Sequence, residues 1–276
     1  MNTNRRQALS ALSALPALSS FSALAALGAT ATTDANAQTP STPTTPRPRL
    51  QIAMLVHPDM TALDLVAPQL VFATLGDADT HLVWKDLSPV TTDSGLKILP
   101  STTFADAPAA PDILFVPGGL RGTTALLQDE DTLRFLRERG AAARWVTGVC
   151  TGVLLLGAAG LLRGHRATAH WYVRELLPIF DAAPVAQRVV VDRNRVTGGG
   201  VTAGIDMALT LSALLRGEAH ARLQTLLFEY APQPPFASGT PELAGQALTA
   251  TVRERRGPAI EAARQAAQKA RDRWTA

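Results

Sequence analysis

The sequence predicts an α/β fold with three layers, in which a mainly parallel sheet has helices on both faces. Short, continuous apolar runs such as residues 50–56 and 112–116 are typical of strands buried on both faces. Between such runs lie segments whose apolar residues recur at helical spacing, as in residues 62–75. Strands that alternate with helices along a chain pair in parallel, so the two patterns together predict this class.

The elements follow one another along the chain, and each rests on its own pattern. The predicted strands are residues 50–56, 81–85, 112–116 and 144–149, with a hairpin around Val90 and Leu96 that turns at 93–95 and another at 189–196 that turns at Arg193 and Asn194. The predicted helices are residues 62–75, 129–139, 151–159, 203–215, 218–230 and the tail from Glu242, which we expect to break at Gly257 and Pro258.

The amino-terminal stretch, residues 1–37, has the pattern of a twin-arginine export signal. Adjacent arginines at positions 5 and 6 precede an apolar run to about residue 30, and residues 35–37, with alanine on both sides of Asn36, supply a cleavage site. A membrane anchor is the alternative, but Pro16 and Gly28 interrupt the run. We therefore expect a periplasmic protein with no stable membrane insertion after cleavage.

Residues 38–49 are rich in proline and threonine and predict an extended linker. The remainder, residues 50–276, suits one catalytic domain with a full core. The net charge is only +3, and no basic cluster with interleaved aromatic residues is present. We therefore expect a small-molecule substrate and no nucleic-acid partner.

The chain has one cysteine, Cys150, which stands between the predicted strand 144–149 and the predicted helix 151–159. Glycines flank this cysteine at 148 and 152, as in a nucleophile elbow, where small neighbours allow a sharp and strained turn. A helix that begins at the cysteine is expected to stabilise its thiolate and lower its pKa. The alternative is a buried structural cysteine. A lone thiol in an exported chain favours the nucleophile.

Two further features fall at the same carboxyl edge of the predicted sheet, where ligands bind in such folds. Gly118 and Gly119 follow a buried strand, and the N–H of Gly119 with that of Thr151 is expected to form an oxyanion-type pocket. Asp64 follows the first strand. Taken alone, it is a carboxylate at a helix start.

The chain resembles the PfpI-like branch of the class I glutamine amidotransferase-like superfamily, which has a flavodoxin-like sheet, and within it the bacterial isocyanide hydratases. The resemblance runs from residue 50 to the carboxyl terminus. It rests on residues 63–65, 117–119, 148–152, 154–162, 166–171, 197–206 and 229–236.

The resemblance implies roles for individual residues. Cys150 is then the nucleophile and Asp64 its acid/base partner, and Cys150 adds to the carbon of an organic isocyanide to give a thioimidate that water hydrolyses to an N-substituted formamide. The resemblance implies a homodimer, and it implies neither a metal nor an organic cofactor. Thr151 stands where protease-like members carry histidine, which argues against a peptidase.

The chain departs from the family pattern in two ways. Its relatives are usually cytoplasmic, whereas we expect this chain to be exported, and Ala67 precedes Pro68 where glycine is common.

Two other functions stay open: a glyoxalase-like hydratase of reactive carbonyls, and a thiol-based stress or redox sensor. The ligand domain of a transcription regulator is a further class, which export argues against.

Three conspicuous positions have competing interpretations. His170 either hydrogen-bonds near the site or has a structural role at a helix start. The glycines 198–200 lack the lysine of a phosphate-binding loop and predict a tight turn before a helix. Asp206 is expected to support the dipole of that helix as a first-turn carboxylate.

Overall fold

The computed structural model describes residues 49–274, so the predicted export signal and nearly all of the predicted linker lie outside the described residues. The strands are β1 (Leu50–Leu55), β2 (Ala78–Trp84), β3 (Val90–Thr91), β4 (Lys97–Ile98), β5 (Thr102–Thr103), β6 (Ile113–Val116), β7 (Trp145–Val149), β8 (Arg166–Ala167), β9 (Ala183–Pro184), β10 (Val189–Asp192) and β11 (Arg195–Gly198). The helices are α1 (Ala62–Ala73), α2 (Leu120–Leu126), α3 (Glu130–Ala142), α4 (Val153–Ala158), α5 (Ala203–Arg216), α6 (Glu218–Leu227) and α7 (Pro241–Asp272), with 3₁₀ helices at Cys150–Gly152 and Arg174–Phe180.

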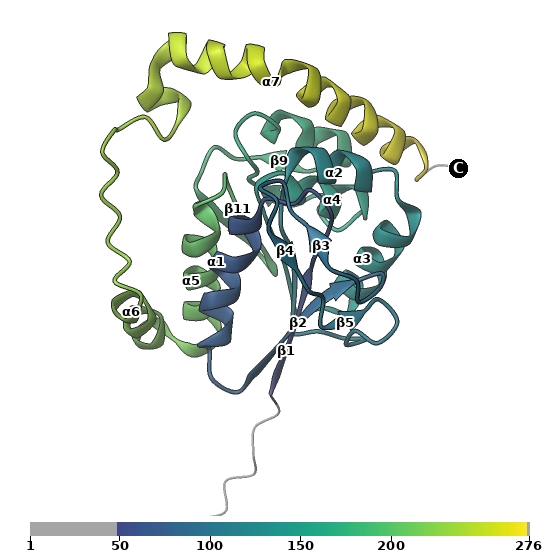
Figure 1. Ribbon diagram of the computed structural model, residues 1–276, viewed down its shortest axis with the longest axis vertical. Coiled ribbons are helices and arrows are strands. Elements are labelled where there is room, and N and C mark those ends of the chain that lie inside the picture. The colour runs from purple at the N-terminus through teal and green to yellow at the C-terminus, as the bar shows by residue number, and fades with distance from the viewer. Residues whose placement is uncertain (1–48, 275–276) are drawn as a thin grey trace, which may run out of the picture. The chain divides into compact units, whose positions relative to one another are not determined.

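The main sheet has seven strands in the order β10-β11-β7-β6-β1-β2-β5. All neighbouring strands in it are parallel except β10 and β11, which form the predicted hairpin. Helices α1, α5 and α6 pack together on one face, and α2, α3 and α4 lie on the other (Figure 1). The predicted three-layer α/β fold is confirmed.

The central strands are buried on both faces, which explains their continuous apolar sequences. Ile52, Met54, Ile113 and Phe115 are all fully buried. The ring of Phe72 on α1 meets that of Phe115 edge-to-face, with 6.0 Å between ring centroids. This packing fixes α1 against the central strands and so positions its first turn near the carboxyl ends of β1 and β6.

Helix α7 differs from the prediction in where its regular geometry is interrupted. The helix continues through Gly257 and Pro258, and the non-helical backbone is at Gly245, with φ of 76°. Pro258 is exposed, so the carbonyl that loses its helical partner there lies on the solvent side. The carboxyl-terminal half docks through buried Ala263 and Ala267. In Figure 1, α7 crosses above the carboxyl ends of the strands.

Candidate active site

Cys150 occupies a strained turn directly after β7, which is the backbone geometry predicted for a nucleophile elbow. Its φ is 58°, a left-handed value that costs a residue with a side chain about 1–3 kcal/mol and persists only where surrounding packing enforces it. Gly152 is part of that enforcement, because a Cβ there would lie 2.2 Å from the carbonyl oxygen of Pro117. The turn places the thiol at the carboxyl edge of the sheet.

Asp64 lies in the first turn of α1 with its side chain fully buried beside Cys150. Its Oδ2 accepts a hydrogen bond of 3.0 Å from the N–H of Gly118, and among residues 49–274 its Oδ1 has no hydrogen-bond partner. A Cβ on Gly118 would come within 2.7 Å of both Asp64 Oδ2 and Cys150 Cβ. The structure therefore brings Cys150, Asp64 and Gly118 together, as the sequence predicts.

Burial and mutual repulsion set the protonation of this pair. Burial raises the pKa of Asp64 to about 7, against the opposing effects of the nearby Cys150 thiol and the Gly118 N–H. Burial also raises the pKa of the Cys150 thiol well above its ordinary value, and the Asp64 charge raises it further; the N–H groups of Thr151 and Val201 oppose this. The lowered pKa expected for Cys150 is thus not what the environment produces. At rest the sulfur holds its proton beside a carboxyl group that can accept it.

Gly119 and Thr151 contact each other, but in a different role from the predicted oxyanion pocket. The N–H of Gly119 donates to the Thr151 hydroxyl at 2.9 Å, and that hydroxyl also hydrogen-bonds the Thr123 hydroxyl at 2.9 Å. Because the Gly118 N–H is taken by Asp64, both loop N–H groups are used within the protein. The hydroxyls of Thr151 and Thr123 thus hold the loop of residues 117–119 against the elbow. Nothing in the sequence pattern indicated the contribution of Thr123, which comes from α2.

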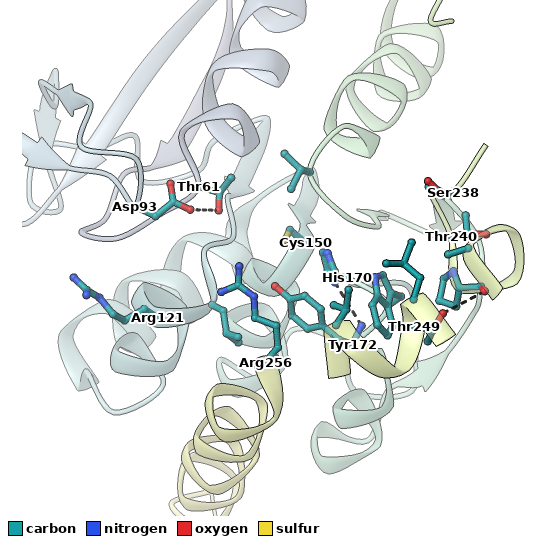
Figure 2. Close-up of a pocket in the computed structure, with 18 of the residues that line it drawn as sticks. Thr61, Asp93, Arg121, Cys150, His170, Tyr172, Ser238, Thr240, Thr249 and Arg256 are labelled. Atoms are coloured by element: carbon teal, nitrogen blue, oxygen red, sulfur yellow. Dashed lines mark hydrogen bonds between the residues drawn. The ribbon is translucent and has the colours of Figure 1, made fainter. Parts of the chain in front are cut away.

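A cavity of about 590 Å³ opens above Cys150 (Figure 2). This size is typical of a small-molecule site. Its lining combines apolar, hydroxyl and charged side chains from several elements: Asp59, Thr61, Asp93, Leu120, Arg121, Cys150, His170, Trp171, Tyr172, Val201, Ser238, Thr240, Leu248, Thr249, Val252 and Arg256. Asp59 pairs with Arg121, and Asp93 accepts a hydrogen bond of 2.7 Å from Thr61.

His170 lines this cavity next to Cys150. Its backbone N–H donates to the Cys150 carbonyl at 3.2 Å, and its ring lies 3.7 Å from the Tyr172 ring between centroids. Burial, helped by Arg256 and Arg174, lowers the pKa of His170 to about 4, so its ring is neutral at neutral pH. Sequence reasoning singled out His170 but missed Tyr172 and Arg256, whose places depend on the fold of distant segments.

The other conspicuous positions have structural roles. The Gly199 carbonyl accepts a hydrogen bond of 2.8 Å from the Cys150 N–H, and Gly199 lies in the predicted tight turn before α5. Asp206, in the first turn of α5 as predicted, pairs with Arg188 and accepts a hydrogen bond of 3.0 Å from Tyr230. Across residues 49–274, no three His, Cys, Asp or Glu side chains are grouped to hold a metal ion. No helix in that part of the chain combines the length and apolar composition needed to cross a bilayer.

Most of the described chain matches a known family. A family model described as DJ-1/PfpI matches residues 50–214, which span the sheet from β1 and both residues of the pair. This chain belongs to the DJ-1/PfpI family.

The chain is similar to three proteins that differ in how much of their length it covers. An isonitrile hydratase from Pseudomonas putida is 52% identical over 212 residues, covering 77% of this chain and 92% of that protein. A solved ThiJ/PfpI family protein from Pseudomonas syringae has a TM-score of 0.78 and 46% identity, covering 79% of this chain and 90% of that one. An HTH-type transcriptional regulator from Pseudomonas aeruginosa is 33% identical over 144 residues, only 37% of its own length. The likeness to the enzyme is the more extensive.

Proposed function

We propose that this protein hydrates organic isocyanides, also called isonitriles, to N-substituted formamides. The observation that carries the proposal is the buried Asp64 carboxyl of α1 beside the Cys150 thiol of the elbow, in a chain 52% identical to an isonitrile hydratase. A nucleophile that lines the cavity, with a proton donor buried directly beside it, suits addition to the terminal isocyanide carbon, which must gain both a bond to sulfur and a proton.

The reaction follows from the protonation of the pair. Asp64 accepts the thiol proton as the Cys150 sulfur attacks the terminal carbon, and the carboxyl group then delivers that proton to the same carbon. The product is a thioimidate in which sulfur, hydrogen and nitrogen are bonded to one carbon. Water adds to that carbon, the carbon–sulfur bond breaks, and the formamide leaves as the thiol regains a proton. A pKa of about 7 for Asp64 makes both of its forms accessible near neutrality.

The test is product analysis with purified protein and its Cys150→Ala variant. We expect formamide from an isocyanide with the parent protein and none with the variant. A hydroxy acid formed from an oxoaldehyde, with no formamide from any isocyanide, would replace this proposal with carbonyl hydration. Neither product, together with reversible oxidation of Cys150, would replace it with thiol sensing.

We also propose that the protein is a homodimer that associates through the face formed by α1 and α6. The two helices adjoin, because the Gln224 side chain of α6 donates a hydrogen bond of 2.9 Å to the Val71 carbonyl of α1. Both helices expose apolar side chains: Val66 and Leu70 on α1 are 44% and 51% exposed, and Leu226 and Leu227 on α6 are 78% and 67% exposed. Exposed apolar side chains grouped in this way are typical of interaction surfaces. Light scattering should give twice the chain mass, and a chain carrying Leu226→Asp and Leu227→Asp should be monomeric.

Export remains a proposal that rests on the sequence of residues 1–37. Replacing Arg5 and Arg6 with lysine should hold the precursor in the cytoplasm, because the twin-arginine route requires that pair. Fractionation of cells followed by immunoblotting measures this. Unchanged accumulation of mature protein in the periplasm would rule out that route.

A further inference from the structure

Helix α7 contributes one face to the cavity above Cys150. Leu248, Val252 and Arg256 are spaced four residues apart, so they lie on the same side of the helix, and all three line the cavity. The guanidinium of Arg253, on the same helix, lies 5.7 Å from the centre of the Trp171 ring and ties α7 to the rim. The helix therefore presents an apolar strip that ends in a cation.

Arg256 differs from the other charged groups of the cavity. Arg121 is paired with Asp59, and Asp93 accepts a hydrogen bond from Thr61. Within residues 49–274, no side chain or carbonyl accepts a hydrogen bond from the Arg256 guanidinium. The cavity thus holds one arginine whose five donors are available to a ligand.

The Tyr172 hydroxyl lies beside this guanidinium. Figure 2 shows both side chains entering the same part of the cavity, with the Tyr172 hydroxyl directed toward the arginine and Cys150 close by. The charge of Arg256 acts on both Tyr172 and His170, which places it near the two rings. A guanidinium and a phenolic hydroxyl together form a donor set for a planar oxyanion.

We propose that Arg256 is a specificity-determining residue that selects isocyanides carrying a carboxylate. This inference rests on the proposed function, because Cys150 must act on the isocyano end of the same molecule. The carboxylate accepts hydrogen bonds from Arg256 and Tyr172, the apolar stem of the substrate packs along Leu248 and Val252, and the isocyano carbon faces the sulfur. Arg256 takes no part in forming or breaking bonds.

The test compares isocyanoacetate and 4-isocyanobutanoate with their primary amides, which have the same shape but no charge. We expect the parent protein to favour at least one carboxylate over its amide by about tenfold or more in kcat/KM. Arg256→Met should lower kcat/KM for that carboxylate by about 10–100-fold and change the value for the amide by less than about twofold. The matched control is Arg255→Met, which alters the neighbouring exposed arginine outside the cavity and should match the parent protein.

A binding measurement separates this inference from the proposed function. Calorimetry with Cys150→Ala should detect binding of the N-formyl carboxylates, and adding Arg256→Met to that variant should abolish it. The selection of carboxylates would be overturned if Arg256→Met lowered kcat/KM equally for carboxylates and their amides. It would also be overturned if Cys150→Ala bound the N-formyl carboxylates and the corresponding amides equally well. If the parent protein hydrates no isocyanide, the proposed function fails, and carboxylate binding dependent on Arg256 would then still show anion recognition by the cavity.

Discussion

Replacing Asp64 with asparagine should stabilise the fold at alkaline pH while it impairs the site. The carboxyl group is fully buried, and its pKa is about 7 in place of an ordinary 3.8. Ionising it in the folded chain therefore costs about 4 kcal/mol more than in the unfolded chain. Because the raised pKa keeps the proton on the folded chain after the unfolded chain has lost it, the free energy of unfolding falls as pH rises from about 4 through about 7.

Asparagine cannot ionise, so the variant lacks this fall. The gain of Asp64→Asn over the parent protein should grow by about 3 kcal/mol between about pH 4.5 and about pH 8, whatever the substitution costs in packing. Urea unfolding at several pH values measures the difference. The control is Thr249→Val, which changes a side chain of the cavity that does not ionise and should leave the pH trend of the parent protein unaltered. A difference between Asp64→Asn and the parent protein that stays constant with pH would refute the raised pKa.

Three further predictions follow from the packing of the site and of α7. The pH midpoint for alkylation of Cys150 should lie above about 8.5, the ordinary cysteine value, and Asp64→Asn should lower this midpoint by removing the adjacent charge. An unchanged midpoint in Asp64→Asn would mean that the Asp64 charge does not act on the Cys150 thiol. Gly118→Ala should lower kcat/KM by at least about 100-fold, since the added Cβ displaces both groups, whereas Gly257→Ala, which meets open space, should not; equal activities would contradict the close approach. Trp274→Ala should lower the free energy of unfolding, measured with urea, by about 2 kcal/mol, because the Trp274 Nε1 donates to the Ala158 carbonyl at 2.8 Å. An unaltered urea midpoint would mean that Trp274 does not anchor the end of α7 at Ala158.

The fold could be predicted because its central strands have a clear sequence pattern. Residues that are buried on both faces must be apolar throughout, so β1, β6 and β7 appear as continuous runs. Two-residue strands such as β5 carry too little pattern to be found, and α2 is only seven residues long. The break expected at Pro258 was wrong, because a proline on the exposed side of a long helix leaves its unpaired carbonyl accessible to solvent.

The site could be predicted in part. Cys150 and Gly118 follow strands closely, and Asp64 lies in the helix that follows β1; parallel topology brings these segments to one edge of the sheet. Arg256 and Tyr172 reach the cavity through the docking of α7 and through the segment after β8, which local patterns do not encode. The hydrogen bonds that the Thr151 hydroxyl makes to α2 and to the glycine loop likewise depend on how α2 packs.

The pKa of Cys150 could not be predicted from the order of residues along the chain. A helix amino terminus is worth about 0.3–1 kcal/mol to a nearby charge, and here the segment after Cys150 starts as a 3₁₀ turn before the six residues of α4. Burying a charge costs several kcal/mol, and Cys150 is only 2% exposed. Burial therefore outweighs the helix, and the burial of a side chain at a turn depends on tertiary packing.

The proposed reaction depends on a covalent bond between the Cys150 sulfur and the substrate carbon during hydration. The most direct measurement is mass spectrometry of protein quenched during turnover of an isocyanide, reduced with borohydride to preserve the thioimidate, and digested. We expect an added mass equal to the isocyanide plus the two hydrogens of reduction, confined to the peptide that contains Cys150. Steady formation of formamide with no adduct on that peptide, or an adduct only on another residue, would contradict it.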